Sequence, residues 1–168
     1  MIDKSQKIIL AIFGAVILVA LIVLIVVVAT RDSRIIISEF EAPEFEKNAV
    51  VGIPEGVDAY AYREIKIDDN FVFSLCMEPV VENDALNIFF TSHKDNDVWM
   101  LIRVYDAKTE EIIGSSGLIR AGEYVEKVTL SDIPSDKSVK VKVLSYEKDT
   151  YLSHGAASAT VPITFVSE

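Results

Sequence analysis

Cysteine is nearly absent from this sequence, because Cys76 is the only one among 168 residues. A single cysteine excludes an intramolecular disulfide and a cysteine-based zinc site, and with them the small disulfide-stapled secreted proteins. We interpret Cys76 as a small apolar strand residue, with a reactive or intermolecular thiol as the alternative. No N-x-Ser/Thr sequon is present either, which removes one hint of eukaryotic secretion.

Histidine is also scarce, with His93 and His154 as the only two. Neither belongs to an H-E-x-x-H pattern, so we expect both in loops. A Ser-His-Asp set built from Ser115 and His154 lacks the G-x-S-x-G turn, and the glycines lack the spacing of a phosphate-binding loop. We therefore expect neither an enzymatic activity nor a cofactor.

Positive charge is in short supply, with 16 Lys and Arg against 26 Asp and Glu. The first seven residues hold two of the basic and one of the acidic side chains, which leaves 14 and 25, a net charge of −11, on the remainder. Such a surface repels phosphate backbones and anionic lipid head groups. We do not expect nucleic acid as a partner.

What the sequence does contain is one long apolar run, residues 8–30, in which 17 of 23 residues are Leu, Ile, Val or Phe and none is charged. A helix of that length spans about 35 Å at roughly 1.5 Å per residue, enough for a hydrocarbon core of about 30 Å. In lipid, a single segment can satisfy its backbone N–H and C=O groups internally only as a helix. We predict a single transmembrane helix, preceded by a cytoplasmic tail at residues 1–7.

The run exceeds the roughly 7 to 15 apolar residues of a cleavable signal peptide, so we favour an uncleaved signal anchor over cleavage before Thr30. Two lysines precede the run and two arginines follow it, so flanking charge leaves the orientation open. A short tail before a long C-terminal part favours the tail inside and the domain outside. We therefore predict a cell-membrane protein with an extracytoplasmic domain.

The remaining chain divides into a linker and one domain. Residues 31–56 combine glutamates with Pro43 and Pro54, which predicts an extended acidic stalk, because like charges repel and proline interrupts regular structure. From 57 to 168 the apolar residues alternate and turn signals recur every eight to twelve residues. This pattern predicts one all-β domain, an antiparallel sandwich.

Alternation also predicts where the strands lie and which faces are buried. Phe71, Phe73, Leu75 and Met77 share one face, which we expect to face the core. The most apolar soluble segment, 98–105, should be a central strand. Pro162 places the last strand at an edge or on a bulge, because proline lacks the ladder donor. The expected strands are 62–67, 71–77, 86–91, 98–105, 111–114, 124–130, 139–143 and 157–166.

Two kinds of residue in the predicted domain are candidates for ligand binding, the acidic and amide residues of three turns and a group of aromatic side chains. The oxygen-rich turns 68–70, 82–84 and 95–97 could hold calcium, but Asp and Asn favour turns for their own hydrogen bonds, and we prefer that interpretation. Aromatic side chains could form an exposed platform for a sugar or a protein, or could instead cover the core and lie across neighbouring strands. The candidates for this platform are Trp99, Tyr105, Tyr124, Tyr146 and Tyr151.

The Val-Lys-Val-Lys-Val strand at 139–143 and the final Thr-Val-Pro-Ile-Thr at 160–164 resemble a fibronectin type III or immunoglobulin-like sandwich. Over roughly 71–165 the chain also resembles small signal-anchored surface proteins of Gram-positive anaerobes, most without an assigned activity. Ala121 departs from that pattern, which has proline there. The resemblance implies a location and a fold and supplies no catalytic residue. It rests on Asn96 to Trp99 through Asp106, Ser116 to Ile119, Gly122 to Glu126, Tyr146-Glu147 and Thr150-Tyr151.

An anchor, an acidic stalk and a sandwich without a catalytic set predict a protein-interaction or structural module at the cell surface, with a protein partner. The alternative is a carbohydrate- or wall-polymer-binding module that uses the exposed aromatic residues.

Overall fold

The computed structural model describes residues 42–57, 61–67 and 71–166. The predicted tail at 1–7, the predicted transmembrane helix at 8–30 and the first part of the predicted stalk, 31–41, lie outside these residues. Within the described ranges, no helix is long and apolar enough to cross a membrane.

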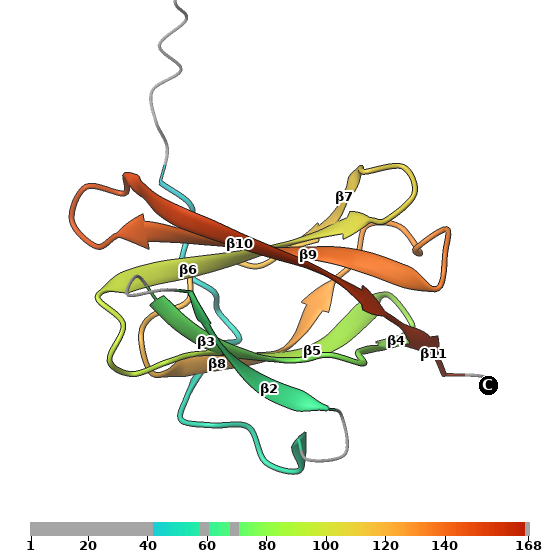
Figure 1. Ribbon diagram of the computed structural model, residues 1–168, viewed down its shortest axis with the longest axis horizontal. Coiled ribbons are helices and arrows are strands. Elements are labelled where there is room, and N and C mark those ends of the chain that lie inside the picture. Colours follow the sequence, from blue (N-terminus) through green and yellow to red (C-terminus); the bar gives the residue numbers. More distant parts are fainter. Residues whose placement is uncertain (1–41, 58–60, 68–70, 167–168) are drawn as a thin grey trace, which may run out of the picture. The chain divides into compact units, whose positions relative to one another are not determined.

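The described chain forms two β-sheets, which Figure 1 shows as two layers. The seven-stranded sheet has the order β1-β8-β5-β3-β2, with β4 beside β5 and β11 beside β4, and the four-stranded sheet has the order β10-β9-β6-β7. Every pair is antiparallel except β11 with β4. The strands are β1 (Val50–Val51), β2 (Tyr62–Ile67), β3 (Phe71–Cys76), β4 (Val80–Glu82), β5 (Ala85–Ser92), β6 (Val98–Asp106), β7 (Ile112–Ser115), β8 (Glu123–Thr129), β9 (Ser138–Glu147), β10 (Ser153–Pro162) and β11 (Thr164–Phe165).

The hydrophobic core fills the space between the two sheets. Alternate residues of each strand point inward, so the period of two in the sequence becomes one buried face per sheet. Three phenylalanines of the seven-stranded sheet stack, with ring centroids 6.1 Å apart for Phe71 and Phe73 and 5.5 Å apart for Phe73 and Phe90. They face fully buried aliphatic side chains of β6 and β9, among them Met100, Ile102, Val104, Val139, Val141 and Val143.

The all-β prediction is confirmed, and so is the predicted core face of β3. Phe71, Phe73 and Leu75 are at most 3% exposed, and Met77 packs against the core from its rim. The segment predicted as a central strand, β6, lies between β9 and β7. Pro162 ends β10, which is an edge strand as predicted.

β7 brings the two sheets together on one side of the sandwich. Gly114 of β7 forms a bridge with Leu130, and Ser131 N donates to Ile113 O at 2.7 Å. A Cβ on Gly114 would lie 2.9 Å from Thr129 O. Only glycine therefore permits this approach of the two sheets.

The structure differs from the predicted stalk over residues 42–56, which pack on the sandwich. β1 pairs with β8, and Phe45 forms a bridge with Leu118. The partners are remote in sequence, since Glu46 and Gly117, which share a hydrogen bond, are 71 positions apart. An acidic, proline-containing composition describes this segment without revealing what it pairs with. The short strands β1 and β4 are likewise absent from the prediction, and the predicted last strand, 157–166, is divided between β10 and β11.

Candidate functional site

Three of the five predicted aromatic residues lie together on the outer face of the four-stranded sheet. Trp99 of β6 is directly opposite Tyr146 of β9. Tyr151, in the β9–β10 turn, places its ring 5.1 Å from that of Trp99, at an interplanar angle of 53°. All three side chains are half-buried. Directly opposite residues on one face of an antiparallel pair have Cβ atoms about 5 Å apart, so these rings cover neighbouring strands.

A fourth ring, which the sequence analysis missed, completes this group. Phe45 packs edge-on against Trp99, with centroids 4.9 Å apart and planes at 82°, and the Arg120 guanidinium carbon lies 3.7 Å from the Phe45 ring centroid. An edge-on aromatic pair contributes about 0.5–1.5 kcal/mol beyond area burial, and an exposed cation–π contact about 0.5–1 kcal/mol. We refer to Phe45, Trp99, Tyr146 and Tyr151 as the aromatic cluster.

The other two predicted residues lie elsewhere. Tyr105 is on the same face of β6 but six residues beyond Trp99, about 20 Å at roughly 3.4 Å per residue, and is opposite Lys140. Tyr124 belongs to β8 in the other sheet, opposite Thr91. The predicted set of five is therefore divided between two sheets and does not form one platform.

Backbone hydrogen bonds fix residues 44–46, which we call the N-terminal segment, and so hold the Phe45 ring against Trp99. Glu46 N donates to Leu118 O, and Leu118 N donates to Glu44 O, both at 2.8 Å. Gly117 N donates to the Glu46 carboxylate at 2.8 Å. A Cβ on Gly117 would lie 2.7 Å from Glu46 N, so this contact requires glycine. Phe45 thus contacts Trp99, and Trp99 in turn contacts Tyr151.

A second candidate site is a cleft of about 580 Å³ on the seven-stranded sheet. Its floor follows the strand register, because Glu64 of β2 is opposite Ser74 of β3, and Ser74 is opposite Thr91 of β5. The Tyr62 hydroxyl forms a hydrogen bond with Thr91 Oγ1 across β3. Three hydroxyl groups and a carboxylate therefore gather on one surface. The remaining lining residues are Gly52, Ile53, Ser92, His93, Lys94 and Gly122.

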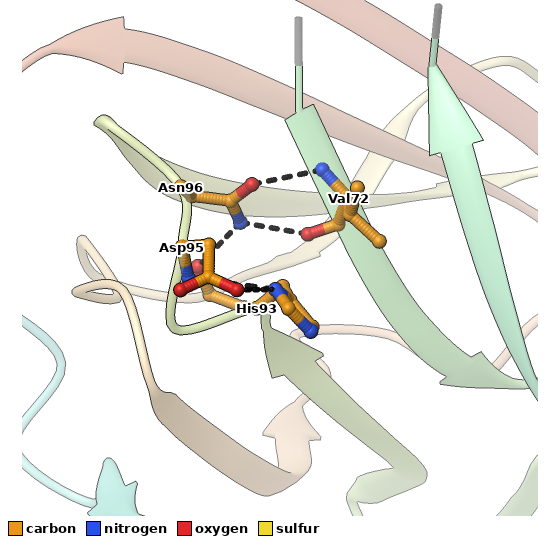
Figure 2. A network of polar contacts seen from close by, with 5 residues as sticks. Val72, His93, Asp95 and Asn96 are labelled. Atoms are coloured by element: carbon orange, nitrogen blue, oxygen red, sulfur yellow. Dashed lines mark hydrogen bonds and ion pairs between the residues drawn. The ribbon is translucent and has the colours of Figure 1, made fainter. Parts of the chain in front are cut away.

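One wall of the cleft, His93–Lys94, belongs to the β5–β6 loop, which Asn96 holds in place. Figure 2 shows the Asn96 side chain reaching to the backbone of Val72 on β3. Val72 N donates to Asn96 Oδ1 at 2.8 Å, and Asn96 Nδ2 donates to Val72 O at 2.7 Å. Asn96 is only 7% exposed, so these are protected hydrogen bonds. The asparagine of the oxygen-rich turn 95–97 thus binds backbone, although that of a strand 24 positions away rather than that of its own turn.

Asp106 is a buried carboxylate with a strongly perturbed pKa, at the end of β6. Hydrogen bonds from Ser135, and then from the backbone N–H groups of Thr109 and Lys108, hold the pKa of Asp106 well below its ordinary value. Ser135 N lies 2.6 Å from Asp106 Oδ2. These partners are the Ser135 hydroxyl and backbone N–H groups of two turns, so Asp106 fixes the β6–β7 turn and the loop before β9.

Cys76 lies in β3, a strand as predicted, and is fully buried, and burial raises the pKa of its thiol. His93 lies in the β5–β6 loop as expected, with its Nδ1 3.5 Å from Asp95, whereas His154 lies in the strand β10 and not in a loop. In the part of the chain that the structure describes, no group of three or more His, Cys, Asp or Glu side chains is arranged to hold a metal ion.

The sequence contains weak signals for both sites. In β2 and β3 polar and apolar residues alternate, which predicts that Tyr62, Glu64 and Ser74 lie on an outward face. Only the register of the strands aligns these residues with Thr91. Phe45 has no local pattern that connects it to Trp99. Comparisons with protein-family models, with curated proteins and with solved structures find no match to this chain.

Proposed function

We propose that this protein is a single-pass membrane protein whose immunoglobulin- or fibronectin type III-like sandwich lies outside the cytoplasm and binds an extended segment of a partner protein. The apolar run at 8–30 supports the membrane anchor, and the net charge of −11 beyond the tail argues against nucleic acid. The resemblance to signal-anchored surface proteins supports the same location. The mode of binding rests on one strand, β10.

β10 is an edge strand of ten residues without a single charged side chain. Natural proteins usually protect long edge strands with lysine, with proline or with a covering segment, because an open edge pairs with other chains. Proline is present only at the end of β10, at Pro162. An unprotected edge of this length is the feature that strand-adding partners use, since main-chain hydrogen bonds supply much of the affinity.

The register of β10 identifies which backbone groups a partner would meet. Ile163 N donates to Lys137 O, and Pro162, which has no N–H, is opposite Ser138. Because residues of an antiparallel strand alternate in the direction of their hydrogen-bonding groups, the odd-numbered residues bond to β9. The outward N–H and C=O groups are then those of Ala156, Ser158 and Thr160, whose side chains are all exposed.

The side of the sandwich next to β10 also has room for a partner's side chains. A small cavity of about 70 Å³ lies between half-buried residues of two edge strands, Ile65 and Ile67 of β2 and Ala157 and Ala159 of β10. An added strand would place alternate side chains over this apolar border. The expected partner is thus an extended segment with small or aliphatic residues at every second position.

Affinity capture from solubilised membranes tests the proposal, using the full chain and two lysine variants. Ser158→Lys places a charge on the open edge, whereas Thr129→Lys places the same charge on an exposed position of β8. We expect one protein to be captured by the wild type and by Thr129→Lys, and lost with Ser158→Lys. Equal capture by all three forms, or no capture by any, would overturn the proposal.

The orientation has a separate test. Protease added to intact, wall-stripped cells should cut within residues 31–41 of the predicted stalk and release the compact unit that begins at Glu41. A full-length band that survives until the cells are lysed would place the domain in the cytoplasm.

A further inference from the structure

We infer that the cleft on the seven-stranded sheet is a binding site for a neutral, polyhydroxylated ligand of the saccharide class. This inference does not rest on strand addition at β10, because the cleft is built on the other sheet. It also differs from sugar binding by the aromatic cluster, since neither Trp99 nor Tyr151 lines the cleft.

The size and construction of the cleft suit a small ligand. Its volume of about 580 Å³ falls within the roughly 300–1,000 Å³ typical of small-molecule sites. The floor consists of adjacent strands in register, Glu64–Ser74–Thr91, and strands hold side chains more rigidly than loops do. Gly52 N donates to Gly122 O, and Gly122 N donates to Ser92 O, both at 2.9 Å, which connects the far wall to the same sheet.

The polar groups in the cleft decide the class of ligand. A free anion would be repelled by the Glu64 carboxylate in the floor of the cleft. A free cation would be repelled by the Lys94 ammonium in its wall. An apolar ligand would offer no partner to the hydroxyl of Ser74, which is costly once water is excluded, whereas Thr91 is already bonded to Tyr62. A ligand hydroxyl both donates and accepts, so a sugar can satisfy the carboxylate, the ammonium and the hydroxyls together.

The site is also organised before any ligand binds. The hydrogen bond between the Tyr62 hydroxyl and Thr91 Oγ1 sets the position of the Tyr62 ring over the floor. Asn96 holds the His93–Lys94 wall through its two hydrogen bonds with Val72 (Figure 2). Preformed geometry lowers the entropy lost on binding, which matters for a weakly bound, strongly hydrated ligand such as a sugar.

The test measures binding of labelled di- and trisaccharides to the full chain in detergent micelles, with neutral hexoses, N-acetylhexosamines and uronic acids in the panel. We expect saturable binding of a neutral sugar. The double variant Glu64→Gln with Ser74→Ala should weaken that binding at least about tenfold, because it alters two direct hydrogen-bonding groups. Glu126→Gln, the same change at an exposed position of β8, and Trp99→Ala should leave binding unchanged.

A measurement on the wild type keeps the inference testable if the double variant folds poorly. Bound sugar should protect Lys94 from an amine-acylating reagent while the exposed Lys127 of β8 reacts as before. Three results would overturn the inference: no binding of any sugar, binding of uronic acids alone, or binding that is lost with Trp99→Ala and kept in the cleft variant.

Discussion

The two sheets of this sandwich meet along two opposite sides, and these sides are built in different ways. On one, the closed side, β7 bridges to Leu130, and residues 117–119 and the N-terminal segment extend the four-stranded sheet beyond β6. On the other, the open side, the edge strands β2 and β10 are not paired with each other, and a small cavity lies between them. One side is closed by backbone contacts within the domain, whereas on the other the even-numbered residues of β10 direct their backbone groups away from β9.

The difference follows from where glycine occurs. Gly114 and Gly117 on the closed side each lie where a Cβ would come within 3 Å of backbone. On the open side, a Cβ on Gly155 of β10 would meet only ordinary contacts, the nearest at 3.4 Å. Of these three glycines, only the two on the closed side are required by a close backbone contact. Changes there should affect folding, whereas changes to the outward groups of β10, those of Ala156, Ser158 and Thr160, should affect binding.

The largest expected effect compares two prolines on the open side. Ala157→Pro removes an N–H that bonds to β9 and should lower the free energy of unfolding by about 3 kcal/mol. Ser158→Pro removes an outward N–H and should cost much less, because no ladder bond within the domain is lost. Urea titration of both variants in detergent measures the difference. Equal destabilisation would show that the assigned direction of the β10 backbone groups is wrong.

The second prediction replaces one glycine on each side with alanine. Gly117→Ala should cost about 1–3 kcal/mol, because a methyl group is forced against the backbone of the N-terminal segment. Gly155→Ala should cost well under that. Trp99 is the only tryptophan, so its emission reports on Phe45 directly. A red shift is expected for Gly117→Ala and not for Gly155→Ala, and unchanged emission in both would contradict the role given to Gly117.

The contrast also explains what could be predicted from sequence. Strands that are indicated by an alternating pattern within their own sequence could be predicted. The predicted strand 62–67 coincides with β2, and the alternation in 98–105 gives the buried face of β6. The N-terminal segment could not be predicted, because it is fixed by Leu118 and Trp99, more than fifty positions away. Local patterns give strands and faces, whereas the closed side depends on tertiary pairing.

The candidate sites follow the same rule. Trp99 and Tyr146 belong to the predicted aromatic group and do lie together, since β6 and β9 are neighbours. Tyr124 was grouped with them and lies on the other sheet, because residue type does not specify strand order. The cleft needs the register of three strands to bring Glu64, Ser74 and Thr91 into line, and no sequence pattern contains that register.

The third prediction concerns pH and the closed side, where Asp106 fixes the turn into β7. Its folded pKa lies below the ordinary value of about 3.9, so its contribution to stability is present above that pH and is lost as pH falls through the folded pKa. Asp106→Asn should therefore lower the melting temperature most near pH 6, with the gap to wild type narrowing below about pH 4. Asp132→Asn, an exposed change nearby, should show no such gap.

The smallest expected effect tests whether charge contributes to the closed side at all. Lys140 Nζ lies 3.5 Å from Glu110 Oε1, which connects β9 to the β6–β7 turn, and the two side chains are 40% and 75% exposed. Exposed pairs at this distance contribute about 0–0.5 kcal/mol and are screened by salt. Glu110→Gln should thus change the free energy of unfolding by no more than about 0.5 kcal/mol, and by less in 1 M NaCl (about 3 Å Debye length). Glu111→Gln, the same change one residue later, is the control. A loss as large as that of Gly117→Ala would mean that ion pairs, rather than close backbone contacts at glycine, hold the closed side together.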